Sequence, residues 1–207
     1  LVKEQGGTKV LIHYGGGSAV RSGLLERVCN SLSEEGISYV TLGGVQPNPR
    51  LSLALEGIEL CREEGVDFLL AVGGGSVIDS TKCIGYGLTN EGDVWDFYLK
   101  IREAKDCMPI GAVLTIAAAG SEMSNSSVMT NEDGMMKRGA RSDHSRCRFA
   151  VMNPELTYTL PAYQTASGCV DILMHTMERY FSREPDTMLT DNLAEGLMRT
   201  VMYNAKL

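Results

Sequence analysis

The sequence lacks the features that would connect it with membranes or secretion. No apolar run approaches the roughly 20 residues that a membrane-spanning helix needs. Its first residues, LVKEQGGTKV, lack the apolar core of a secretory signal. They also lack a methionine, so we expect the chain to begin inside a longer reading frame or to have been trimmed. We expect no membrane partner and a cytoplasmic location.

Closely spaced cysteines and concentrated positive charge are also missing. The six cysteines form no C-x-x-C pair, so neither a disulfide framework nor a cysteine zinc site is indicated. Several lie at apolar periodic positions, where we expect core thiols. The formal net charge is −7, so nucleic acid is not an expected partner. The one basic cluster is predicted to be a solvated loop and consists of Lys137, Arg138, Arg141, Arg146 and Arg148.

What the sequence does contain is an alternation of strand and helix patterns. Helical patterns separate the apolar runs, and a glycine ends each of two helical patterns. This order predicts an α/β fold with a parallel sheet. From residue 161 onward only helical patterns remain, so we predict an α/β domain over 1–157 and the start of an all-helical domain over 158–207. The predicted strands are 9–14, 37–42, 66–72 and 109–119.

The stretch VGGGSVIDSTK, residues 72–82, places three glycines between a predicted strand and a predicted helix. Free N–H groups and the positive end of a helix dipole would meet there, an arrangement that suits an anion such as a phosphate. Ser76 could add a hydroxyl group, and Asp79 follows in the first helical turn. The P-loop pattern and the G-x-G-x-x-G fingerprint both fail, the latter at Ile78. A phosphate site of another kind and a tight turn both remain open.

A second polar pattern lies in the helical part. Asp171 and His175 are four residues apart, so they project from one face of a helix. A carboxylate and an imidazole so placed can hold two positions of a divalent cation, although such pairs are also common as surface electrostatics. His13 and His144 are far away in sequence and are expected to be structural or loop residues.

Five ordered motifs together resemble the iron-containing alcohol dehydrogenase family, most of all its NADPH-dependent butanol dehydrogenase and aldehyde reductase branch. The resemblance implies a dinucleotide-binding α/β domain and a helical domain, with the active site between them. The motifs are YGGGS (14–18), LGGVQPNP (42–49), LLAVGGGSVIDSTK (69–82), AAGSEMS (118–124) and GCVDILMHTMERY (168–180).

The resemblance implies cofactor roles for residues in the first domain. Gly43 and Gly44 end the second strand, where NAD-preferring relatives carry an aspartate, so their presence is compatible with NADP, with NAD still possible. The residues that match the pyrophosphate turn are Gly73, Gly74, Gly75, Ser76 and Asp79. The residues that match positions around the nicotinamide and its ribose are Thr115, Ser124 and Lys137.

The resemblance also implies a metal centre and a reaction. Asp171 and His175 match the first two of four ligands for Fe²⁺ or Zn²⁺. The other two are histidines that lie beyond the position of Leu207 in the family, so the chain looks truncated within the helical domain. The implied activity is hydride transfer between the nicotinamide and a small primary alcohol or aldehyde, in a homodimer, with no residue indicated as general acid. A polyol dehydrogenase and a non-catalytic nucleotide-binding fragment are the alternatives.

Overall fold

The computed structural model describes residues 1–205 and divides the chain into two compact units. The first unit is Leu1–Thr157, and the second begins at Tyr158. Among residues 1–205, none of the helices combines the length and the hydrophobicity that a membrane span requires.

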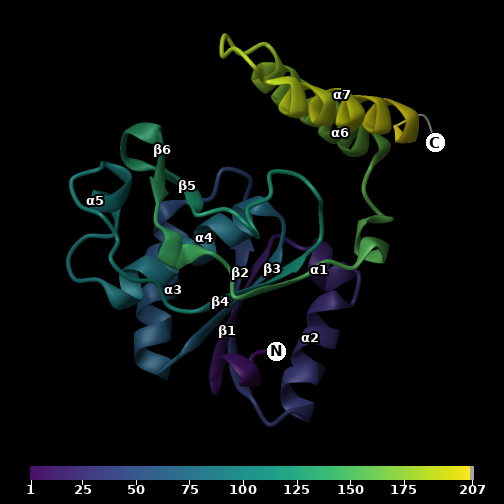
Figure 1. Cartoon of the computed structure of the whole chain (residues 1–207). Helices are drawn as coiled ribbons and strands as arrows, with labels where there is room; N and C mark the ends of the chain where they lie inside the picture. The colour runs from purple at the N-terminus through teal and green to yellow at the C-terminus, as the bar shows by residue number, and fades with distance from the viewer. Residues whose placement is uncertain (206–207) are drawn as a thin grey trace. The chain divides into compact units, whose positions relative to one another are not determined.

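A five-stranded parallel sheet forms the centre of the first unit, with the strand order β2-β1-β3-β4-β7 (Figure 1). The predicted α/β class with a parallel sheet is therefore confirmed. β3 is buried along its whole length, as its nearly continuous apolar sequence predicts. The strands of this sheet are β1 (Lys9–Gly15), β2 (Ser38–Val45), β3 (Phe68–Gly73), β4 (Ile110–Leu114) and β7 (Phe149–Val151).

Helices cover both faces of the sheet because successive strand side chains point to opposite faces. Leu11 and Leu69 pack in one core cluster with side chains of α3 and α4. Ile12 and Leu70 pack in another, with side chains of α2. The helices of this unit are α1 (Ser18–Arg21), α2 (Leu24–Glu34), α3 (Leu51–Glu64), α4 (Gly75–Thr89) and α5 (Trp95–Tyr98). The short 3-10 helices are η1 (Lys3–Gln5), η2 (Asp133–Met135), η3 (Asp143–Ser145) and η4 (Pro154–Thr157).

Two predicted segments differ from the structure. The solvated loop proposed for the basic cluster is wrong in part, because β5 (Ser126–Asn131) and β6 (Met136–Arg141) form an antiparallel hairpin. Ala140 is the only buried residue of β6, so the strand carries almost no apolar signal. The strand predicted over 109–119 is also too long, since β4 ends at Leu114. After the half-buried Thr115 and Ile116, residues 117–119 are exposed alanines with no large side chain to bury.

The second unit is a pair of helices, α6 (Ala162–Tyr180) and α7 (Met188–Asn204). The Tyr180 hydroxyl donates a hydrogen bond to the Glu195 carboxylate at 3.0 Å, which links the two helices. Apolar side chains nevertheless remain in solvent on both, among them Val170 on α6 and Leu193 on α7, with exposed fractions of 57% and 66%. Because α6 and α7 are its only regular elements among the described residues, the predicted helical character of this segment is confirmed.

Candidate functional site

The three glycines lie where β3 ends and α4 begins, at the carboxyl edge of the parallel sheet. Gly74 is the N-cap, and its carbonyl accepts the N–H groups of Val77 and Ile78 at 3.0 and 3.2 Å. Gly75 and Ser76 come before Val77 in the helix, and no described residue accepts a hydrogen bond from their N–H groups. Two unsatisfied donors therefore point out of a 15-residue helix at its positive end, which is an anion-binding arrangement.

Close packing explains why side chains are absent from this turn. A Cβ atom on Gly73 would lie 2.5 Å from the Val77 Cγ2 atom, and one on Gly74 would lie 2.6 Å from the Ile116 Cγ2 atom. Thr115, which follows β4, donates its N–H to the Gly73 carbonyl at 3.1 Å. The structure thus places Thr115 directly beside the glycine turn.

Lys82 connects the helix to the loop that follows β4. Its side chain is fully buried, and its ammonium group donates to the carbonyl oxygens of Ser121, Ser124 and Ser126 at 2.8, 2.7 and 2.9 Å. It also lies 3.3 Å from the Ser124 hydroxyl. Burial lowers the pKa of Lys82. Ser124 is therefore held against α4 by a lysine that sequence reasoning missed, although a lysine within a helix as apolar as α4 was an available signal.

Asp79 lies one helical turn after the glycines and contacts the β5–β6 hairpin. Its Oδ2 atom accepts the N–H of Val128 at 3.0 Å, and its carbonyl accepts the Ser127 hydroxyl at 2.8 Å. The Oδ1 atom is buried and has no hydrogen-bond partner among the described residues. Burial raises the pKa of the Asp79 carboxyl. Asp79 thus has a structural contact that the sequence did not reveal, and one carboxylate oxygen is left over.

Gly43 and Gly44 lie at the end of β2, at the same carboxyl edge. A Cβ atom on Gly43 would lie 2.5 Å from the Cζ atom of Tyr14, so the tyrosine ring fills the space of a side chain. Lys137 lies on β6, where its ammonium group donates to the Asn48 side-chain oxygen at 2.7 Å. Its contact with Asn48 joins the hairpin to the loop that follows β2.

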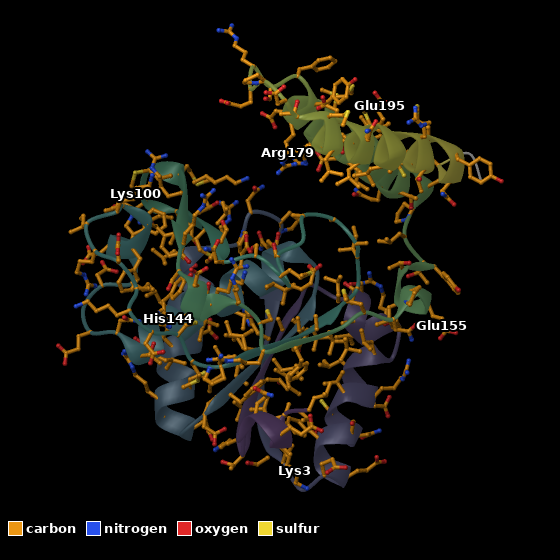
Figure 2. All side chains as sticks on the ribbon, viewed as in Figure 1. Lys3, Lys100, His144, Glu155, Arg179 and Glu195 are labelled. Carbon is orange, nitrogen blue, oxygen red and sulfur yellow. The ribbon has the colours of Figure 1, made fainter. Side chains whose placement is uncertain are left out.

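His13 joins β1 to its neighbours and is buried, as expected for a structural histidine. Its Nδ1 atom donates to the Leu42 carbonyl at 2.8 Å, and its Nε2 atom then accepts the Ser80 hydroxyl at 2.9 Å. The imidazole therefore fixes the end of β2 to α4. His144, the other histidine of this unit, is exposed in η3 (Figure 2).

We predict that His13 makes the first unit acid-sensitive. Burial lowers its pKa from the usual 6.5 to about 4, so between these values the unfolded chain binds a proton that the folded chain does not. The free energy of unfolding should fall as the pH drops through this window, by about 1.4 kcal/mol per pH unit. Urea denaturation should show this fall in the protein and in His144→Gln, and a shallower one in His13→Gln. A His13 proton resonance that titrates above pH 6 would contradict the prediction.

Asp171 and His175 lie one turn apart on α6, with 3.6 Å between the carboxylate Oδ2 and the imidazole Nδ1 atoms. Their side chains are 64% and 61% exposed, so both are accessible to an ion. No group of three or more histidine, cysteine, aspartate or glutamate side chains suited to a metal occurs among residues 1–205. The pair can supply one oxygen ligand and one nitrogen ligand to a metal ion, which is only part of a coordination sphere.

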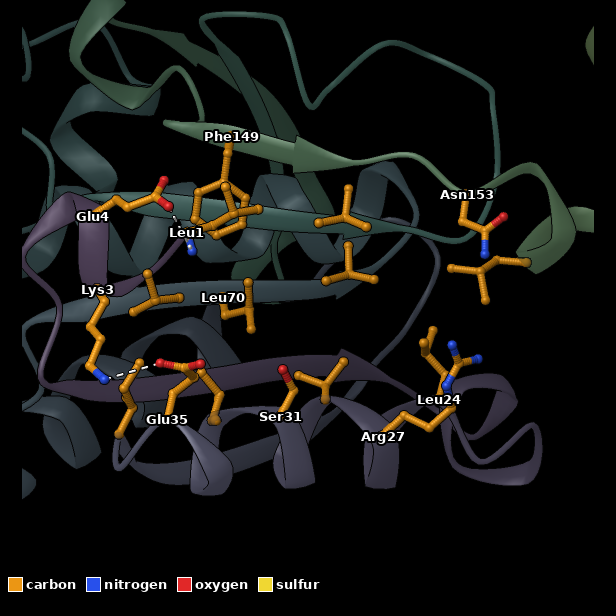
Figure 3. A pocket seen from close by; sticks show the side chains of 17 residues that line it. Leu1, Lys3, Glu4, Leu24, Arg27, Ser31, Glu35, Leu70, Phe149 and Asn153 are labelled. Atoms are coloured by element: carbon orange, nitrogen blue, oxygen red, sulfur yellow. Dashed lines mark hydrogen bonds and ion pairs between the residues drawn. The ribbon is translucent and has the colours of Figure 1, made fainter.

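A separate groove of about 650 Å³ lies on the α2 side of the sheet (Figure 3). Leu24 of α2, Leu70 of β3 and Phe149 of β7 line it, and an ion pair between Lys3 and Glu35, 3.0 Å apart, spans one end. No residue of the glycine turn, 73–76, lines this groove. The groove is therefore distinct from the candidate anion site.

A parallel sheet with a glycine turn and free helix N–H groups at its carboxyl edge defines an α/β nucleotide-binding architecture. Comparisons with known proteins identify the kind. Residues 1–154 match the model of the family described as iron-containing alcohol dehydrogenase. The chain belongs to the iron-containing alcohol dehydrogenase family, which confirms the resemblance of its motifs.

Several relatives show how much of a family member the chain spans. It is 47% identical to a probable NADH-dependent butanol dehydrogenase 2 of Bacillus subtilis, over 96% of this chain and 51% of the relative. It is 38% identical to an NADPH-dependent aldehyde reductase of Escherichia coli, over 94% and 50%. The crystal structure of a Thermotoga maritima NADH-dependent butanol dehydrogenase A superposes with a TM-score of 0.93 at 39% identity, over 99% and 51%. The chain spans about half the length of these relatives.

Proposed function

We propose that the chain supplies the cofactor-binding part of a metal-dependent NAD(P)H alcohol dehydrogenase or aldehyde reductase. The observation that carries the proposal is the turn from Gly73 to Ser76, whose free N–H groups suit the pyrophosphate of a dinucleotide. Lys82 holds the loop that carries Ser124, which by resemblance faces the nicotinamide and its ribose. The family and the names of its relatives support an alcohol or aldehyde as substrate.

For the metal, we propose Asp171 and His175 as two of the ligands of Fe²⁺ or Zn²⁺. Both ions accept this combination of oxygen and nitrogen, so the ligands do not select between them. An ion held there would supply Lewis-acid polarisation of a carbonyl oxygen, and a dihydronicotinamide would supply the hydride. The contribution of the first unit is then to bind and orient the cofactor. We also propose that the protein acts as a homodimer.

For the cofactor, we propose a preference for NADP over NAD. Gly43 and Gly44 place no carboxylate at the end of β2, where one would repel a 2′-phosphate. Relatives of both kinds exist, since the Bacillus subtilis protein is named for NADH and the Escherichia coli protein for NADPH. The preference therefore has to be tested on this chain itself.

We predict that NADPH stabilises the chain against heat more than NADH does at equal concentration. A ligand at 100 times its dissociation constant adds about 2.7 kcal/mol to the free energy of unfolding. For a chain of this size that corresponds to a rise in melting temperature of about 5 °C or more. Differential scanning fluorimetry with each nucleotide measures the two shifts. Equal shifts would contradict the NADP preference, and two null results would contradict the nucleotide site.

A further inference from the structure

A second hollow lies at the carboxyl edge of the sheet, near the glycine turn. It has a volume of about 590 Å³ and lies between the ends of β1 and β2. The register of this strand pair shifts between His13 and Gly15, which pairs with Val45, so the pairing is irregular at this edge. The described residues that line it are Tyr14, Gly15, Gly16, Gly17, Val20, Arg21, Gly43 and Gly44.

Arg21 is the only charged residue in this lining. The Arg21 side chain is exposed and forms no hydrogen bond or ion pair with any of residues 1–205, whereas the backbone N–H donates to the Gly17 carbonyl at 2.9 Å. A Cβ atom on Gly17 would lie 2.6 Å from the Arg21 Nη1 atom, so the guanidinium group lies against the backbone of the loop after β1. Gly17 also has a φ of 148°, which residues with a side chain rarely adopt. The lack of a side chain at this position leaves room for the guanidinium group.

The position of the hollow relative to the glycine turn suits one nucleotide. β1 is the neighbour of β3, and β2 is the next strand, so two strand spacings, about 10 Å, separate the end of β3 from the end of β2. A nucleotide with its pyrophosphate on the turn would extend its adenosine along this edge. The ring of Tyr14, packed on Gly43, prevents a carboxylate-bearing side chain there without rearrangement.

We propose that Arg21 is the residue that recognises the 2′-phosphate of NADP in this hollow. The inference rests on the proposed function, and it names a specificity residue that lies outside the glycine motifs. A guanidinium group suits a phosphate because it can donate two parallel hydrogen bonds, and a phosphate monoester carries nearly two negative charges at neutral pH. Tyr14 and Gly43 contribute by keeping a competing carboxylate out.

The test is calorimetric titration of the chain with NADPH and with NADH, in the protein and in Arg21→Gln. We expect the dissociation constant for NADPH to rise about tenfold or more in Arg21→Gln. The dissociation constant for NADH should change less than about twofold. Arg21→Lys should keep much of the NADPH affinity, since it retains the charge. Arg27→Gln on α2 serves as the control, because it removes an exposed arginine that lines the other groove.

The outcomes separate this inference from the proposed function. Equal NADPH affinity in the protein and in Arg21→Gln would overturn the role of Arg21 while leaving the nucleotide site intact. Tighter binding of NADH than of NADPH by the unsubstituted protein would overturn it as well. Binding of neither nucleotide would overturn both proposals. Unchanged melting temperatures of the variants without ligand would confirm that each of them folds.

Discussion

Replacement of Lys82 by methionine is expected to lower the free energy of unfolding by about 3 kcal/mol. The substitution keeps the aliphatic length of the side chain but removes the donor shared by the carbonyl groups of Ser121, Ser124 and Ser126. Each buried acceptor left without a partner costs about 1 to 3 kcal/mol. The substitution also removes the desolvation cost of the buried ammonium group, which offsets part of that loss. Urea denaturation at neutral pH measures the difference.

The control for this substitution is Lys9→Met. Lys9 forms an ion pair with Glu64 at 2.6 Å, but the two side chains are 29% and 42% exposed. Such a pair contributes less than about 1 kcal/mol, so this variant should stay close to the original stability. A Lys82→Met variant as stable as Lys9→Met would contradict the anchoring role of Lys82. If Lys82→Met folds, faster hydrogen exchange confined to residues 120–126 would support that role.

Replacement of Gly73 by alanine is the second large effect that we expect. The new methyl group would lie 2.5 Å from the Cγ2 atom and 3.0 Å from the Cβ atom of Val77. A change of rotamer cannot relieve the second contact, because a Cβ atom moves only with its backbone. Overpacking of this kind costs about 1 to 3 kcal/mol. It should also displace the start of α4, and therefore the free N–H groups of Gly75 and Ser76.

Gly139→Ala on β6 is the matched control, since its added Cβ atom would have only ordinary contacts at 3.8 Å. Thermal unfolding should show a lower melting temperature for Gly73→Ala and little change for Gly139→Ala. Similar melting temperatures for the two variants would show that the turn tolerates a side chain. The close approach of β3 to α4 would then have no energetic importance.

Features that depend on local sequence were accessible without a structure. β3 and the turn after it follow one another directly, so an apolar run, three glycines and a helical pattern predicted the strand and the helix, with either an anion site or a tight turn between them. Asp171 and His175 were likewise predicted to share a helix face, because their spacing of four matches the helical period. The roles assigned to all of these residues remain predictions.

Features that depend on distant contacts were not accessible. Lys82 acts on carbonyl groups about 40 residues later in the chain, and backbone acceptors have no signature in a sequence. The pairing of β5 with β6 was missed because a ribbon with one exposed face contains few apolar residues. Arg21 lies in a helix of four residues, and only the folded structure brings it beside Gly43 and Gly44.

The most direct test of the central claim, that the glycine turn seats a dinucleotide, is a calorimetric titration of this chain with NADPH. We predict saturable binding with one nucleotide per chain, weakened about tenfold or more in Gly73→Ala and unchanged in Gly139→Ala. Absence of binding by the folded chain would contradict the claim. So would equal affinity in a folded Gly73→Ala variant.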